Sequence, residues 1–162
     1  MSDKKIELSR SAHSVQEVLA KKGLNFKVVE LLESTRTAED AAKTIGCDVA
    51  QIIKSLVFRT KETKKPVLIL VSGVNRVNEG VISQLIGEKI EKADAGFVRE
   101  VTGFAIGGIP PVGHAQIIET LIDEDLLQHN YLWAAAGTPH AVFRINSAEL
   151  VGITDGRVVE VV

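Results

Sequence analysis

A single lysine stands inside an otherwise apolar run, in the segment IIKSLVF at residues 52–58. If a strand begins at Lys54, the alternation of side chains places this lysine on the same face as Leu56 and Phe58. An isolated ammonium is costly to bury, so such a lysine reaches water along its stem, finds an anionic or carbonyl partner, or lines a cavity. The segment alone does not choose between a lysine that reaches solvent and one that lines a cavity.

The segment GFAIGGIPPVGH, residues 103–114, is the densest cluster of glycine and proline in the chain. Glycines let the backbone approach a ligand and expose N–H groups, whereas prolines fix the loop, so that those groups need not reorganise. Such a loop could bind a carbonyl oxygen or an oxyanion, and the alternative is a rigid turn between two strands. It is neither a dinucleotide fingerprint nor a P-loop, because G-x-G-x-x-G and a following G-K-[ST] are both absent.

Other residues that could carry chemistry are scattered. The histidines do not stand beside cysteines or acids at metal-ligand spacing, so we expect no metal and no other cofactor. Cys47 follows Gly46 at a junction between helices, a position typical of a small packing residue. No G-x-S-x-G elbow supports a serine hydrolase. His140 precedes a strand, where its ring either faces a pocket at the rim of a sheet or is a solvent-exposed turn residue.

Around these residues the sequence predicts helices and strands joined by short loops. Helix signals cover residues 11–22, 38–45, 79–86, 95–102 and 147–153, with shorter turns from 48 and 123. Strand signals cover 26–31, 55–60, 66–73, 89–94, 118–123, 131–137, 140–145 and 157–162. Thr37 and Asn78 are expected to cap helices, and Gly46 and Gly103 to end them. The irregular order favours an α+β fold, with helices packed around a mixed, largely antiparallel curved sheet, over a doubly wound parallel sheet.

Composition sets further bounds. At 162 residues we expect one domain, spanning 1–162, and 45% hydrophobic and 25% charged residues are typical of a globular protein. A net charge of −2 without a basic block argues against strong non-specific nucleic-acid binding, although it leaves room for a local patch. The single cysteine suits a reducing cytoplasm, and we expect no secretory signal, membrane span or membrane partner.

Three separated stretches, IIKSLVF at 52–58, TGFAIGGIPPVGH at 102–114 and AAAGTPHAVFRI at 134–145, together resemble the YbaK/prolyl-tRNA-synthetase-associated editing domain family. The order of the motifs also fits, and the resemblance extends from about Ala12 to Val162. Members are free-standing or synthetase-embedded deacylases that hydrolyse aminoacyl-tRNA carrying the wrong amino acid. The resemblance implies a free-standing hydrolase that edits a small amino acid on tRNA(Pro) or a related tRNA, with the aminoacyl-tRNA 3′ end and an aminoacyl-tRNA synthetase as expected partners.

The resemblance also implies roles for particular residues. Lys54 corresponds to the family's active-site lysine, and the family's G-x-x-x-P loop maps onto residues 107–111 (Gly107, Gly108, Ile109, Pro110 and Pro111). We expect the N–H groups of Gly107 and Gly108 to hold the ester carbonyl, while Lys54 anchors a carbonyl or the terminal phosphate. Ile109, Pro110, Pro111, Gly113 and, by a looser match, His140 are expected to bind the substrate. The chain has GTPH where the cysteine-editing branch has Gly-Lys-Arg-Gly, which puts specificity for Cys-tRNA in doubt.

Two other functions stay open. The chain could be a binding or regulatory module that kept the fold without the reaction, or a hydrolase of another small ester or thioester, because a lysine and a loop do not encode tRNA. Lys61, Lys64 and Lys65, which follow the strand of Lys54, are either phosphate contacts or a solvated turn.

Overall fold

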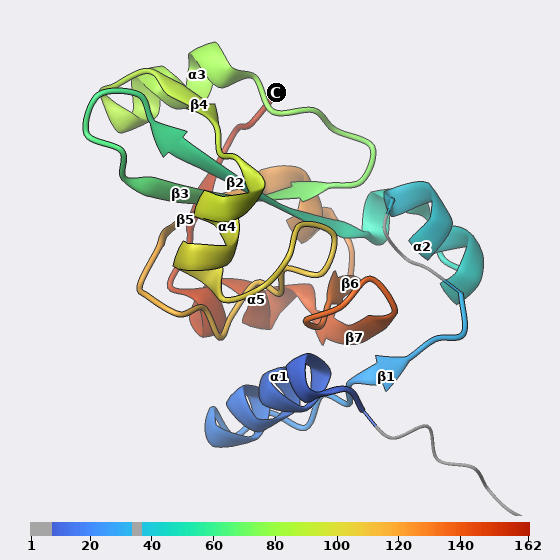
Figure 1. The fold of residues 1–162 in the computed structure, drawn as a ribbon. Helices are drawn as coiled ribbons and strands as arrows, with labels where there is room; N and C mark the ends of the chain where they lie inside the picture. Colours follow the sequence, from blue (N-terminus) through green and yellow to red (C-terminus); the bar gives the residue numbers. More distant parts are fainter. Residues whose placement is uncertain (1–7, 34–36) are drawn as a thin grey trace, which may run out of the picture.

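The computed structural model describes residues 8–33 and 37–162, and within them the strands form two sheets (Figure 1). The larger sheet has the order β4 (Ile90–Lys92), β2 (Ile53–Thr60), β3 (Pro66–Ser72), β5 (Glu119–Asp123) and β8 (Arg157–Val159). The smaller sheet has the order β1 (Val29–Glu30), β7 (Ala141–Asn146) and β6 (Tyr131–Ala135). The pairs β3–β5 and β5–β8 are parallel and the others are antiparallel. The expected α+β class with largely antiparallel pairing is confirmed, and the strands divide between two sheets.

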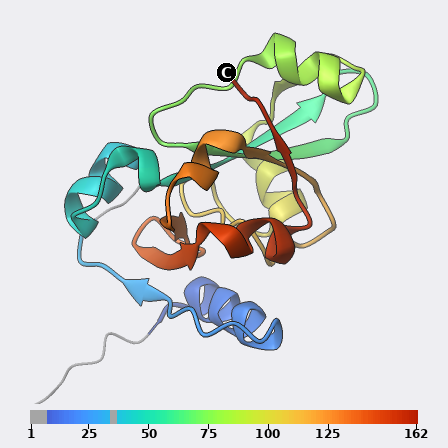
Figure 2. The ribbon, with the colours of Figure 1, turned by 180° about the vertical axis from the view of Figure 1, so that it is seen from behind.

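The helices are α1 (Arg10–Lys21), α2 (Ala38–Ile45), α3 (Glu79–Ile86), α4 (Ala95–Thr102) and α5 (Ser147–Thr154), with 3-10 turns η1 (Val49–Gln51) and η2 (Glu124–Gln128). The expected caps are confirmed: Thr37 and Asn78 accept backbone N–H bonds at the starts of α2 and α3, and Gly46 and Gly103 end α2 and α4 in the left-handed conformation. Both views show α1 and α3 at opposite ends of the molecule, with α2 beside the start of β2 (Figures 1 and 2).

The strand expected at 26–31 is reduced to Val29–Glu30. The side chain of Gln16 in α1 explains the difference, because its Nε2 donates to the Phe26 carbonyl at 2.9 Å and its Oε1 accepts the Val28 N–H at 2.8 Å. Backbone groups that a strand would pair are therefore satisfied by a helix side chain. These two hydrogen bonds hold α1 against residues 26–28, which lead into β1.

Apolar clusters cover both faces of the larger sheet. In β3, Leu68 and Leu70 belong to one cluster and Val71 to the other, and all three are fully buried. In β2, Val57 contributes to the first cluster and Phe58 to the second, so Lys54 lies on the Phe58 face, as the alternation predicted. Among the described residues, none of the helices has the length and apolar character needed to cross a bilayer.

Candidate active site

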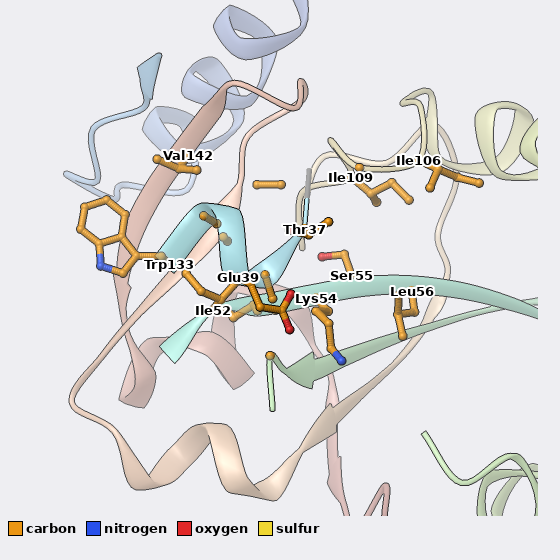
Figure 3. A pocket seen from close by; sticks show the side chains of 17 residues that line it. Thr37, Glu39, Ile52, Lys54, Ser55, Leu56, Ile106, Ile109, Trp133 and Val142 are labelled. Atoms are coloured by element: carbon orange, nitrogen blue, oxygen red, sulfur yellow. The ribbon is translucent and has the colours of Figure 1, made fainter. Parts of the chain in front are cut away.

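A cleft of about 360 Å³ lies where the two sheets meet. Ile52 and Trp133 form a parallel bridge there, which joins the start of β2 to β6. The walls of the cleft come from the start of α2, from β2, from the loop after α4, and from β6 and β7 (Figure 3). Its volume falls at the small end of the roughly 300–1,000 Å³ that ligand pockets occupy. The cleft therefore suits a small ligand or a small part of a larger one.

Strand β2 has an open edge beside this cleft. Its partner β3 covers one side along the whole strand, whereas β4 covers the other side only from Phe58 to Thr60. The Thr60 N–H donates to the Lys65 carbonyl, so even-numbered residues of β2 bond toward β3 and odd-numbered residues point toward the other edge. The backbone N–H and C=O of Ser55 therefore face the open edge.

The hydroxyl of Ser55 has no hydrogen-bond partner among the described residues, although its oxygen is buried. Figure 3 shows this hydroxyl on the side of β2 where Ile109 lies. Nearly all buried hydroxyls in folded proteins are bonded, so an unpartnered one calls for an explanation. Because Ser55 lines the cleft, a polar ligand atom would supply the missing partner.

Lys54 lines the same cleft, but its ammonium is turned to the opposite side of β2 from Ser55 (Figure 3). Its Nζ donates to the backbone carbonyl of Asn75, in the connection after β3. The Asn75 side chain in turn donates to Asp123 and to Asp125, at 2.8 Å in both cases, and Asp123 is almost fully buried. The lysine therefore donates to a carbonyl whose residue is held by one buried carboxylate, Asp123, and one half-buried carboxylate, Asp125.

Burial lowers the pKa of the Lys54 amine, because the charged form loses hydration. The negative charges of Glu39 and Asp123 oppose this effect, and the positive charge of Arg76 adds to it. An ammonium with incomplete hydration gains from an additional oxygen partner. A carbonyl or anionic oxygen in the cleft would provide one if the side chain swings from Asn75 toward the loop.

The opposite wall is the loop that follows α4, and Gly107 and Ile109 line the cleft from it. The N–H of Gly107 has no protein acceptor among the described residues, whereas the Gly108 N–H donates to the Ala105 carbonyl at 3.1 Å. Of the two amides expected to bind an ester carbonyl, Gly107 is therefore the one available in this conformation. A catalytic role for Gly107 and Gly108 stays a prediction.

Gly108 fixes the loop from behind. Its carbonyl accepts the Gly137 N–H at 2.8 Å, and a Cβ added to it would stand 2.8 Å from the Cα and N of Thr138. Real Cβ atoms do not approach backbone so closely, so only glycine lets the loop and the turn between β6 and β7 meet. The glycine therefore sets the position of the neighbouring Gly107 amide.

The two prolines of this loop face the protein interior. Pro110 and Pro111 are buried, and the Pro110 carbonyl is 2.7 Å from Nε2 of His114. Burial lowers the pKa of His114, although the bond to the carbonyl opposes this. The neutral ring donates its Nε2–H to Pro110 and braces the loop from within.

Four predicted substrate-contact residues, Pro110, Pro111, Gly113 and His140, lie outside the lining of this cleft, and so does Gly108. Gly113 is exposed, and a Cβ there would stand 3.3 Å from Val18 of α1. His140 is exposed as well; its N–H donates to Thr138 Oγ1 at 3.2 Å and its carbonyl accepts the Leu31 N–H at 2.7 Å. The structure thus places Lys54, Gly107 and Ile109 in the lining of one cleft, although the Lys54 ammonium is turned to the side of β2 away from Ile109. Substrate contacts by Pro110, Pro111, Gly113 and His140 stay predictions.

Among the lining residues that sequence reasoning missed, Ser55, Glu39 and Trp133 bring a hydroxyl, a carboxylate and an indole to the cleft. A serine among apolar residues on one strand face was a signal for Ser55, parallel to the signal that singled out Lys54. Glu39 and Trp133 gave no such signal, because only the meeting of the two sheets places α2 and β6 beside β2. Their approach to Lys54 is a property of the tertiary fold.

Comparison with known proteins places this site in a family. A family model for the aminoacyl-tRNA editing domain matches residues 33–153. The protein YwhH of Bacillus subtilis (strain 168) is 32% identical over 123 residues, which are 76% of this chain and 78% of that protein. A proline–tRNA ligase of Thermoanaerobacter sp. (strain X514) is 26% identical over 149 residues, which are 90% of this chain but 25% of the ligase.

A solved structure shows the same fold. It is described as a candidate trans-editing enzyme for prolyl tRNA synthetase, and it superposes with a TM-score of 0.90 at 48% identity. The match covers 95% of this chain and 98% of that chain. Sequence and fold agree, and the chain belongs to the aminoacyl-tRNA editing domain family.

Proposed function

We propose that this protein hydrolyses the ester bond of mischarged aminoacyl-tRNA, with a small amino acid on tRNA(Pro) or a related tRNA as substrate. The observation that carries the proposal is one small cleft lined by Lys54, Ser55 and Gly107, whose amide has no acceptor within residues 8–33 and 37–162. Membership of the editing-domain family and the likeness to a candidate trans-editing enzyme support it. The reaction belongs in the cytoplasm, where tRNA and the synthetase that mischarges it would be the partners.

Hydrolysis of this bond needs only modest catalysis by the protein, because an aminoacyl ester is already activated relative to an amide. The Gly107 N–H donates to the ester carbonyl oxygen and stabilises the negative charge that develops on it. The Lys54 ammonium, released from Asn75, anchors a second oxygen of the substrate. A water oxygen then bonds to the carbonyl carbon, the bond from that carbon to the ribose oxygen breaks, and a water proton ends on the ribose oxygen.

The cleft between the two sheets, called the first cleft from here on, fits an acyl group of limited size. Its walls include apolar side chains such as Ile52, Trp133 and Val142, and Glu39 is the carboxylate placed to meet an α-ammonium group. One methylene in such a pocket is worth only about 1–3 kcal/mol of discrimination, or roughly 10–200-fold. Hydrolysis in the cleft of this protein would supply the accuracy that the synthetase's own amino-acid pocket lacks for small amino acids.

A deacylation panel tests this function. The protein is incubated with tRNA(Pro) mischarged with alanine, cysteine or serine, and with correctly charged Pro-tRNA(Pro), and release of the amino acid is followed. We expect rapid release of one small amino acid and slow release of proline. Release from none of these substrates, or from free aminoacyl esters as fast as from tRNA, would favour a binding module or a general esterase instead.

A further inference from the structure

A second cleft, of about 590 Å³, continues along β2 from the first. The two share five lining residues, from β2 and from the loop after α4: Lys54, Ser55, Leu56, Ile106 and Ile109. Beyond these, the second cleft runs past Phe58 toward the end of β4 and the start of α3. Open space thus extends on both sides of the residues that would hold the ester.

Charge distinguishes the second cleft. Arg76 and Lys92 line it with Lys54, whereas Glu79 is its single carboxylate. Arg76 and Lys92 are exposed, and neither forms an ion pair with a carboxylate among the described residues. By contrast, Lys64 of the loop between β2 and β3 pairs with Glu91 at 2.9 Å. In a chain with a net charge of −2, this local excess of cations calls for an anionic ligand.

The floor and the rim of the second cleft are apolar. Leu56, Val77 and Val98 line it, and Ile106, which lines both clefts, has 57% of its surface exposed. An exposed apolar side chain beside unpaired cations suits a nucleotide, because a base or ribose covers apolar surface while its phosphate meets the cations. Arg76 can also bind a phosphate in bidentate fashion or stack on a base.

The substrate has the same two-part form. In aminoacyl-tRNA the ester lies between an amino acid and the terminal ribose, so its two sides must occupy different spaces. If the acyl group fills the first cleft, the ester lies beside the residues that both clefts share, and the terminal nucleotides continue into the second cleft.

We propose that the second cleft binds the 3′-terminal nucleotides of tRNA, with Arg76 and Lys92 contacting their phosphates. This assignment rests on the proposed function and names the part of the substrate that the second cleft takes. Single-stranded ends need few phosphate contacts, so two cations suffice without a basic surface.

The test compares two double variants with the same change of charge. Arg76→Ala with Lys92→Ala removes the cations of the second cleft, and Lys61→Ala with Lys65→Ala removes two exposed lysines of the loop between β2 and β3, outside that cleft. Binding of a fluorescent RNA minihelix ending in CCA is measured by anisotropy at several salt concentrations. The same RNA without its terminal adenosine, and free AMP, separate recognition of the RNA end from binding of any phosphate.

We expect Arg76→Ala with Lys92→Ala to weaken minihelix binding roughly tenfold and to make the slope of log K against log salt shallower by about 1.4, since each single-strand phosphate contact contributes about 0.7. With mischarged tRNA, KM should rise more than kcat falls. The loop variant should change both quantities less. Equal losses in the two variants, no loss in the first, no binding by the wild type, or AMP competing as well as the minihelix would overturn the assignment.

The outcomes separate this inference from the proposed function. A wild-type protein that binds the minihelix through Arg76 and Lys92 but releases no amino acid would retain the second cleft and reject the hydrolase. A protein that deacylates tRNA equally well with and without the two cations would retain the hydrolase and reject the second cleft.

Discussion

The two walls of the first cleft are built in different ways. On β2, the functional groups are side chains on a strand that pairs with β3 along its length. Either Lys54 or Ser55 could therefore be replaced by another residue without moving the backbone. On the loop after α4, the functional group is a backbone amide, and its position depends on Gly108 and His114 behind it. The first wall can therefore lose activity and keep stability, whereas the second should lose both together.

Electrostatics sharpens the contrast. Burial of the Lys54 ammonium has a cost, since it lowers the pKa of the amine, and the bond to the Asn75 carbonyl and the charges of Glu39 and Asp123 oppose that cost. The loop, in contrast, consists of neutral groups whose hydrogen bonds are part of the fold. A charged group with reduced hydration in a cleft indicates a functional role. Neutral groups that form hydrogen bonds within the protein indicate a structural role.

Substitution of Lys54 should give the largest effect. If its ammonium stabilises the transition state as strongly as an oxyanion donor, worth about 3–4 kcal/mol, Lys54→Ala should lower deacylation by two orders of magnitude or more. The melting temperature should change little, because removal of an ammonium with reduced hydration is opposed by loss of its hydrogen bond to the Asn75 carbonyl. Lys54→Met, which keeps the apolar stem, separates the charge from the packing. An unchanged rate in folded Lys54→Ala protein would exclude the lysine from the reaction.

Gly108→Ala should affect both activity and stability. The new Cβ would stand 2.8 Å from the Thr138 backbone, so the loop must move away from the turn. Overpacking of this kind costs about 1–3 kcal/mol of unfolding free energy, and the displaced Gly107 amide should lower kcat roughly tenfold or more.

Gly152→Ala is the matched control for Gly108→Ala. Gly152 lies within α5, and a Cβ there meets nothing within 4 Å. Alanine is favoured over glycine inside a helix by roughly 0.5–1 kcal/mol, so this variant should be as stable as the wild type or more so. Chemical denaturation and single-turnover deacylation measure the two effects. A Gly108→Ala protein with full activity would show that the loop position does not control the site.

The same division decides how much the sequence could predict. Helix ends depend on local bonds, such as those of Thr37 and Asn78, so they were predictable. Asp123 caps η2, the short turn expected from residue 123, but it also accepts the N–H of Ser72 at 3.0 Å from a distant strand. That second bond, and with it the support of Asn75 and Lys54, depends on tertiary structure and gave no local signal.

The loop after α4 illustrates both halves of this lesson. Its glycines and prolines indicated a rigid segment that presents backbone groups. Which amide is free could not be read from the motif, because Gly107 and Gly108 are equivalent in type, and only the turn to Ala105 and the contact with Gly137 distinguish them.

The pH dependence of stability tests the bracing of the loop by His114. Burial lowers its pKa, so the folded state favours the neutral ring. This contribution is present above the pKa of the unfolded histidine, about 6.5, and is lost as the pH falls through the lower pKa of the folded state. His114→Gln keeps a neutral N–H donor. The variant's unfolding free energy should therefore fall less than that of the wild type between pH 7 and pH 5, as measured by urea denaturation. Identical pH profiles would mean that His114 does not couple the loop to acid.

Ser55→Ala should give the smallest change and the most specific one. Its buried hydroxyl has no partner among the described residues, so its removal should leave the unfolding free energy unchanged or slightly higher. If a substrate oxygen supplies the missing bond, deacylation should fall by roughly three- to tenfold, the equivalent of about one hydrogen bond.

Ser72→Ala provides the contrast within the same sheet. The hydroxyl of Ser72 donates to the Ala50 carbonyl at 2.8 Å, so its loss should reduce stability by about 1 kcal/mol. If Ser55→Ala destabilised the protein as much as Ser72→Ala and left deacylation unchanged, its hydroxyl would be part of the fold. The wall on β2 would then resemble the wall on the loop, because Ser55 would contribute to stability. The proposed difference between a functional wall and a structural wall would be wrong for this residue.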